Sequence, residues 1–100
     1  MAKKYDGVIE AVRYRDGQIE EVRAFERRGA AFSDRILIPR QKLIDRLKNG
    51  KKFVVGQRKE FLAGTFETSK SVQLVSRGGR EFISTHSDAE RDELEQAPVF

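Results

Sequence analysis

The sequence predicts a mainly antiparallel β-sheet with one amphipathic helix, which is the α+β class. Two dipeptides, Asp16-Gly17 and Gly78-Gly79, each separate two β-prone segments, as two-residue hairpin turns do. Only residues 40–49 convincingly place apolar side chains on one face at helical spacing. With the glycine and polar breaks elsewhere, this predicts about seven short strands in the order β-β-β-α-β-β-β-β.

The first hairpin is predicted over residues 5–15 and 18–28. Its Asp16-Gly17 turn suits type I′, because glycine accepts positive φ freely and aspartate tolerates it. The register that follows joins apolar residues with apolar residues and acids with bases. The predicted pairs are Tyr14–Ile19, Arg13–Glu20, Ala11–Val22, Glu10–Arg23 and Val8–Phe25.

The helix is predicted over residues 40–49, after a short buried strand at residues 35–38. Pro39 suits the first turn of a helix, where a missing N–H leaves no hydrogen bond unmade. Asn49-Gly50 ends the helix, because glycine favours the position past the last turn. The apolar face consists of Leu43, Ile44 and Leu47.

Four strands are predicted after the helix, at residues 53–57, 61–67, 71–76 and 81–85. Thr68-Ser69-Lys70 is expected to link the second of them to the third. The last two form a hairpin closed by Gly78-Gly79. Its register sets Val75 opposite Phe82 and Leu74 opposite Ile83.

The acidic C-terminal segment, residues 88–100, is predicted to begin with a short helix that ends near residue 96. Ser87 with Glu90 three residues later forms a capping box. The apolar face of that helix is small, which makes the helix marginal. Phe100 is expected to pack against the sheet, because burial removes its apolar surface from water.

The expected architecture is a small barrel or a strongly curved sheet, because open strand edges invite pairing with other chains. The order of the first five strands, with a helix after the third, is similar to that of an OB-fold. This similarity is one of topology and includes no diagnostic residues. An SH3-like barrel and an open sheet packed on the helix are the alternatives.

Length and composition predict a single domain over residues 1–100. No cysteine is present, which excludes disulfides and thiol nucleophiles and is compatible with a reducing compartment. No apolar run is long enough to cross a membrane, and residues 1–6 do not resemble a signal peptide. We therefore expect a cytoplasmic protein without membrane contact.

No catalytic residue, metal site or cofactor is predicted. His86 is the only histidine, and no motif places a nucleophile beside it. The acids after Ser87 lack the central glycine of a calcium loop. Gly50-Lys51-Lys52 lacks the other residues of a phosphate-binding loop. A non-enzymatic role is the expectation that remains.

The uneven distribution of charge is the one feature that indicates a partner. Residues 35–59 contain nine Lys and Arg against Asp45 alone, whereas residues 86–100 contain five acids against Arg91. Clustered cations attract the phosphates of RNA or DNA, so the leading hypothesis is a binding module with weak, sequence-independent affinity for nucleic acid. The alternative is a protein-interaction or regulatory module that uses a strand edge or the C-terminal segment, and an unrecognised enzyme is third. The candidate nucleic-acid-binding residues are Lys42, Arg46, Lys48, Lys51, Lys52, Arg58 and Lys59.

Overall fold

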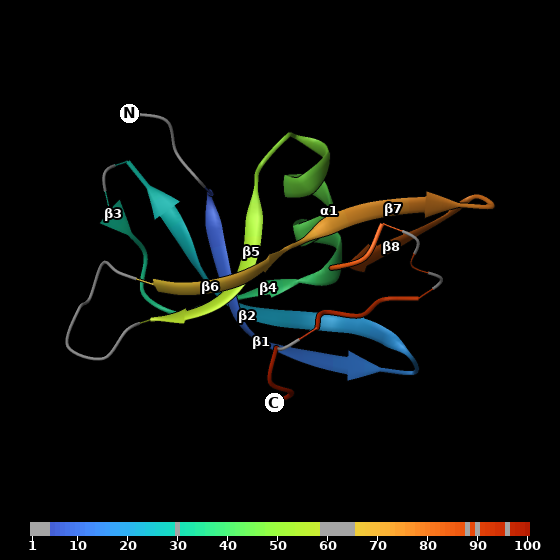
Figure 1. The fold of residues 1–100 in the computed structure, drawn as a ribbon, viewed down its shortest axis with the longest axis horizontal. Helices are drawn as coiled ribbons and strands as arrows, with labels where there is room; N and C mark the ends of the chain where they lie inside the picture. The colour runs from blue at the N-terminus through green and yellow to red at the C-terminus, as the bar shows by residue number, and fades with distance from the viewer. Residues whose placement is uncertain (1–4, 30, 59–65, 88, 90, 96) are drawn as a thin grey trace.

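A computed structural model describes residues 5–29, 31–58, 66–87, 89, 91–95 and 97–100, and of Arg58 only the backbone. The described chain is mostly β-strand with one helix, which confirms the α+β class (Figure 1). The elements are β1 (Gly7–Arg15), β2 (Gln18–Arg28), β3 (Ala31–Phe32), β4 (Ile36–Pro39), α1 (Arg40–Lys48), β5 (Phe53–Arg58), β6 (Phe66–Ser71), β7 (Gln73–Arg77) and β8 (Arg80–Ser84).

The strands form a six-stranded sheet and a separate two-stranded sheet. The large sheet has the order β3-β2-β1-β5-β6, and β4 shares one edge of β2 with β3. The α1 crossover carries the chain from β4 past β2 and β1 to β5, so β5 pairs with β1 in parallel. The other strand pairs are antiparallel. Among the described residues no closed barrel is found, because the sheet ends at β6 on one side and at β3 and β4 on the other.

The first hairpin has the predicted turn but only part of the predicted register. Asp16 and Gly17 have φ of 53° and 79°, as a type I′ turn requires. The outer pairs, Tyr14–Ile19 and Val8–Phe25, are confirmed. The three middle pairs are wrong, and the strands pair instead as Arg13–Glu21, Val12–Val22 and Ala11–Arg23.

Two β-bulges explain this difference. Glu20 is an extra residue on β2, and Glu10 is an extra residue on β1 that restores the register. Strict alternation would send the side chains of Ile9 and Val12 to opposite faces of the sheet. The bulge at Glu10 lets both enter the same core.

Helix α1 agrees with the prediction to within one residue. It buries Leu43 and Ile44, and the extended Pro39 precedes its first turn. At its end Gly50 has a φ of 83°. The N–H groups of Gly50 and Lys51 donate to the carbonyls of Leu47 and Arg46, which is the Schellman arrangement.

The second half of the chain confirms one hairpin and corrects one linker. Gly78-Gly79 closes β7 and β8 with Val75 opposite Phe82 and Leu74 opposite Ile83, as predicted. Thr68-Ser69-Lys70 is not a linker but part of β6, because its backbone continues the ladder with β5. Most of the strand predicted at residues 61–67 lies outside the described residues.

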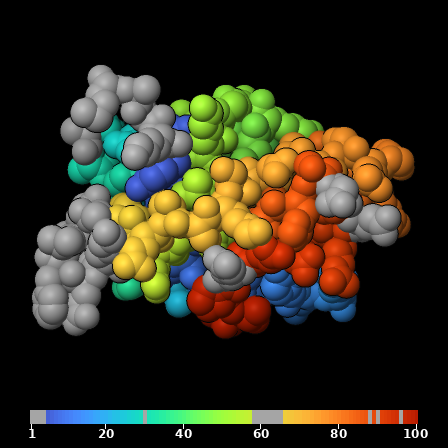
Figure 2. All heavy atoms as spheres, viewed as in Figure 1, coloured from blue at the N-terminus to red at the C-terminus, as the bar shows by residue number. Residues whose placement is uncertain are grey.

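The predicted C-terminal helix is not found among the described residues of the segment, which leave out 88, 90 and 96. The segment is extended, and it forms parallel bridges between Glu93 and Ser84 and between Val99 and Val12. In Figure 2 this red segment lies between the orange β7–β8 hairpin and the blue β1–β2 hairpin. Three of its described residues, Ala89, Asp92 and Leu94, are buried, and this anchoring outweighs the weak preference for a helix.

The two faces of the large sheet carry two separate cores. The main core joins α1 to β1, β2, β4, β5 and the C-terminal segment through residues such as Ile9, Val22 and Leu43. A smaller core lies on the opposite face of the sheet. It consists of Val8, Phe25 and Phe66, with Tyr5, Phe32 and Val54 packed against it. Within the described ranges no helix is long and apolar enough to cross a membrane.

Candidate nucleic-acid interface

Five of the seven predicted binding residues lie on α1 or directly after it. Lys42, Arg46 and Lys48 lie on α1, and Lys51 and Lys52 follow its C-terminal turn. Arg58 ends β5, which leads away from this turn for roughly 16 Å. Lys59 lies outside the described residues. We call the five residues on α1 and directly after it the α1 patch.

Acids from distant strands neutralise part of this α1 patch. The guanidinium of Arg46 donates to the Glu26 carboxylate of β2. Lys48 Nζ lies 2.9 Å from a Glu81 oxygen of β8. Both cations also occupy the last turn of α1, where the helix dipole favours positive charge. These two residues thus have structural partners, and Lys42, Lys51 and Lys52 are the cations of the patch without an ion pair among the described residues.

A different basic surface lies on the face of the sheet away from α1. In β2, Val22 and Ala24 enter the core with α1, so the alternating residues Arg23, Phe25 and Arg27 face the other way. We call this surface the arginine face. It consists of Arg13, Arg23, Arg27 and Arg35, with Phe25, Phe32 and Phe100 beneath them.

Each of the four guanidinium groups lies over an aromatic ring. The Cζ atoms of Arg13 and Arg23 are 4.7 and 4.9 Å from the centre of the Phe100 ring. Those of Arg27 and Arg35 are 4.5 and 5.6 Å from the rings of Phe32 and Phe25. Such contacts between a cation and an aromatic ring hold the planar groups in position.

Carboxylates fix the spacing of these arginines. The side chain of Glu10 at the β1 bulge is only 10% exposed, and its Oε1 lies 2.9 Å from Arg23 Nε and 2.5 Å from Arg35 Nε. The Arg23 Nε–H makes no hydrogen bond within the described residues, so its contact with Glu10 is an ion pair with poor hydrogen-bond geometry. Glu21 pairs with Arg13 at 3.4 Å. The described ion pairs thus join three of the four arginines to two carboxylates, and Arg13 Nε also donates to the Phe100 oxygen at 3.4 Å.

The side chains on this face remain accessible. Those of Arg13, Arg23 and Arg35 are 46%, 41% and 60% exposed. A hollow of about 430 Å³ lies between them, and its lining consists of Glu10, Ala11, Arg23, Arg35, Gln57 and Pro98. Phe100 docks beside it, because its N–H donates to the Val12 carbonyl and its ring contacts two arginines. The prediction that Phe100 packs against the sheet is confirmed.

The described acids of the C-terminal segment make their ion pairs away from the α1 patch. Asp92 is buried against Arg40, and Glu95 contacts Lys70 and His86. His86 Nε2 lies 2.9 Å from Glu95 Oε1, so a carboxylate is its described partner rather than a nucleophile. Among the described residues no three His, Cys, Asp or Glu side chains gather where they could hold a metal ion.

Charge counting along the sequence missed the arginine face, because residues 1–34 have balanced charge. The signal that could have revealed it is alternation. Arg23, Phe25 and Arg27 stand two residues apart in a predicted strand, and that spacing places basic and aromatic side chains on one face. The contribution of Phe100 could not be read in this way, because it depends on where the C-terminal segment docks.

Comparison of the chain with protein-family models, with curated proteins and with solved structures gave no match.

Proposed function

We propose that this protein is a non-enzymatic binding module that takes single-stranded RNA or DNA on its arginine face. The observation that carries the proposal is the continuous set of guanidinium–ring contacts on one face of a sheet. Arginine provides several N–H donors in a planar group that pairs with phosphate oxygens and also stacks on bases. A β-sheet with such side chains is a common platform for single strands.

The balance of charge supports weak binding that depends little on base sequence. Two of the four arginines share the carboxylate of Glu10, and Arg13 pairs with Glu21. A phosphate competes with these carboxylates for N–H groups, which lowers the affinity. Contacts with phosphates position a strand but carry no base information.

The experiment compares two double variants that lose the same charge. Arg13→Gln with Arg35→Gln removes two cations of the arginine face, and Lys51→Gln with Lys52→Gln removes two of the α1 patch. Binding of a labelled single-stranded 12-mer is measured by fluorescence anisotropy at about 50 mM salt. The arginine variant should bind roughly 10- to 50-fold more weakly, because two phosphate contacts are lost, and the lysine variant should bind like the unmodified protein.

The other possible results would assign binding to a different surface or exclude nucleic acid. A larger loss in the lysine variant would place the strand on the α1 patch. No binding by the unmodified protein at low salt would remove nucleic acid as a ligand. An unchanged melting temperature, measured for each variant by circular dichroism, would show that the variant is folded and that its loss of binding is not caused by unfolding.

A protein partner is the second candidate, and one observation favours it. Leu37 pairs with Arg23 in the β4–β2 register, and it is 55% exposed although it is a large apolar residue. Exposed apolar side chains beside arginines are typical of protein interfaces. If the oligonucleotide does not bind, the arginine face with Leu37 becomes the surface on which to seek a protein.

A further inference from the structure

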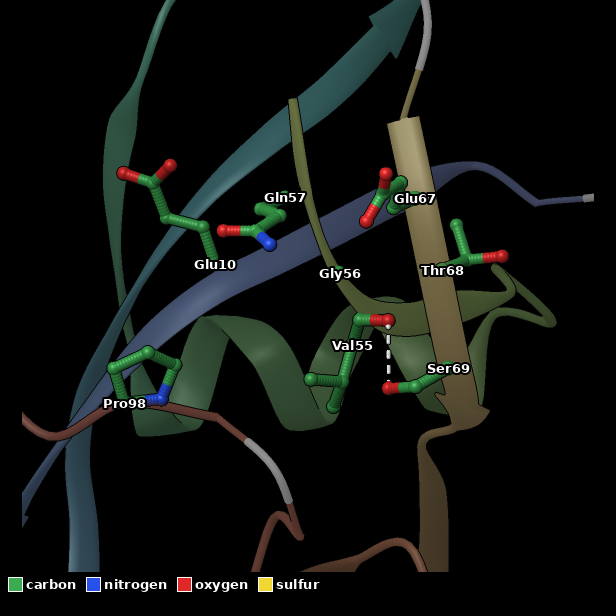
Figure 3. A pocket seen from close by; sticks show the side chains of 8 residues that line it. All are labelled: Glu10, Val55, Gly56, Gln57, Glu67, Thr68, Ser69 and Pro98. Carbon is green, nitrogen blue, oxygen red and sulfur yellow. Dashed lines mark hydrogen bonds between the residues drawn. The ribbon is translucent and has the colours of Figure 1, made fainter. Parts of the chain in front are cut away.

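A polar hollow lies at the point where one edge of β1 stops pairing with β5 and begins to pair with the C-terminal segment. On one edge, β1 pairs with β5 at Gly7–Ile9 and then with the C-terminal segment at Val12. The bulge at Glu10 lies between these two pairings. The hollow there has a volume of about 290 Å³ (Figure 3), and we call it the fork hollow. Its lining consists of Glu10, Val55, Gly56, Gln57, Glu67, Thr68, Ser69 and Pro98.

The polar groups of the fork hollow are mainly hydrogen-bond acceptors. Two carboxylates line it, and among the described residues no Lys or Arg does. Both arginines that contact Glu10 reach its Oε1, and no hydrogen bond to its Oε2 is found among the described residues. The Ser69 hydroxyl donates to the Val55 carbonyl at 3.2 Å, so its hydrogen is already used. The two carboxylates therefore favour an occupant that supplies N–H donors.

The backbones of β5 and β6 form part of the wall of the fork hollow. Gly56 brings β5 close to β6, because a Cβ at this position would collide with the carbonyl oxygen of Glu67. In the view of Figure 3 the Gln57 amide lies between the Glu10 and Glu67 side chains. Its oxygen adds another acceptor and its NH₂ supplies donors for a ring carbonyl or nitrogen.

The fork hollow is continuous with the arginine face. Glu10, Gln57 and Pro98 line both this hollow and the one that includes Arg23 and Arg35. A strand whose phosphates contact those arginines passes the mouth of the fork hollow. The volume is at the lower end of the range for small-molecule sites, which suits a single base better than a whole nucleotide.

We propose that the fork hollow is a base-reading site that accepts a base with an exocyclic amino group in preference to uracil or thymine. The amino groups of cytosine, adenine and guanine donate N–H bonds to carboxylates. Uracil and thymine have a carbonyl oxygen in place of the amino group of cytosine, so on that edge only their N3–H can donate to a carboxylate. This inference rests on the proposed function, because the arginine face must first hold the strand.

The test compares 12-mers of cytidine and of uridine at one salt concentration by fluorescence anisotropy. These two pyrimidines differ at position 4, where cytosine has an amino group and uracil a carbonyl. The cytidine 12-mer should bind at least about fivefold more tightly. Glu67→Gln should reduce that preference to less than twofold without changing the salt dependence. The matched control Glu93→Gln removes an acid of the same type that pairs with Arg91 elsewhere, and it should keep the preference.

The outcomes separate the inference from the proposed function. Equal binding of the two 12-mers, or tighter binding of uridine, overturns the base-reading site and leaves the arginine face in place. A preference for cytidine that survives Glu67→Gln also overturns the assignment to this hollow. Binding of neither 12-mer overturns the proposed function itself, and the acceptors of the hollow are then free for another N–H donor, such as a lysine of a protein partner.

Discussion

At the scale of single residues, Asp92 has the largest number of partners from separate elements in the described chain. Its Oδ2 accepts hydrogen bonds from Ile19 N and Arg40 Nε, both at 2.8 Å. Its Oδ1 accepts from Ile83 N at 3.0 Å and from an Arg40 Nη at 3.3 Å. The hydrogen bond with Asp92 raises the pKa of Arg40 although burial opposes this. One carboxylate thus joins β2, β8 and the start of α1 to the C-terminal segment.

We expect Asp92→Asn to destabilise the protein by about 3 kcal/mol, because it leaves Arg40 without its counter-charge and replaces an acceptor oxygen by an NH₂ group. Urea-induced unfolding followed by circular dichroism measures this loss. The matched control is Glu93→Gln next to it, whose exposed contact with Arg91 at 3.6 Å should contribute less than about 0.5 kcal/mol. A loss below 1 kcal/mol for Asp92→Asn would contradict the role given to this carboxylate.

At the scale of elements, the C-terminal segment connects the two sheets. Glu93 bridges to β8, Leu94 enters the main core, and residues 98–100 pair with β1. Within the described residues these contacts and the packing of α1 hold the β7–β8 hairpin to the large sheet. The segment therefore acts as a strap rather than as a free acidic tail.

Removal of residues 98–100 should lower the melting temperature by about 5–10 °C. The deletion removes two backbone hydrogen bonds to Val12, each of which contributes about 1 kcal/mol, together with the packing of Phe100. Differential scanning calorimetry measures the change. The control is Val99→Ser, which should have little effect because Val99 is 67% exposed. An unchanged melting temperature after the deletion would contradict docking.

The contacts that Glu95 of the C-terminal segment makes with Lys70 and His86 should weaken in acid. Its contact with Lys70, and secondarily with His86, lowers the pKa of Glu95 below its usual 4.5. The folded state therefore binds this proton less readily than the unfolded state does. The resulting stability is fully present above about pH 4.5 and is lost as the pH falls through the lowered pKa.

Glu95→Gln tests this dependence. The variant should be less stable than the unmodified protein at pH 7, and the difference should shrink as the pH falls below about 4.5 and through the lowered pKa of Glu95. Urea unfolding at several pH values between 3 and 7 measures it. Glu20→Gln, which removes a more exposed contact with Arg15, serves as the comparison and should show a smaller change. A difference for Glu95→Gln that stays constant with pH would refute the explanation.

At the scale of the whole molecule, folding brings together charged residues that are far apart in the sequence. The basic stretch at residues 35–59 meets Glu10, Glu26, Glu81 and Asp92 from other parts of the chain. The balanced N-terminal stretch instead supplies three of the four cations of the arginine face. Net charge along a segment is thus a poor guide to the charge of a surface in a protein with so many ion pairs.

The salt dependence of oligonucleotide binding should reflect three or four phosphate contacts. For single strands this gives a slope of about −2 to −3 when log K is plotted against log salt concentration. Anisotropy titrations between 25 and 200 mM salt, about an eightfold range, are sufficient to measure it. A slope near zero would mean that phosphates do not carry the binding. A slope steeper than about −5 would require cations beyond the arginine face.

Local chemistry was enough to predict the turns and the helix of this protein. Asp16-Gly17, Gly78-Gly79 and Asn49-Gly50 act through the φ angles of one or two residues, and α1 follows from the spacing of three apolar side chains. Such features depend on neighbours in sequence, so the sequence by itself determined them and the α+β class.

Tertiary structure alone decided the strand partners and the site. The bulges at Glu10 and Glu20 keep apolar residues in one core, and that core includes α1, which no local pattern within the hairpin reveals. No local pattern reveals the parallel pairing of β1 with β5 either. Nor does one reveal the path of the C-terminal segment, whose Asp92 and Phe100 contact distant strands. These features come from packing between segments far apart in the chain. The arginine face, assembled from β1, β2, the residue before β4 and the C-terminal segment, therefore exists only once those segments have met.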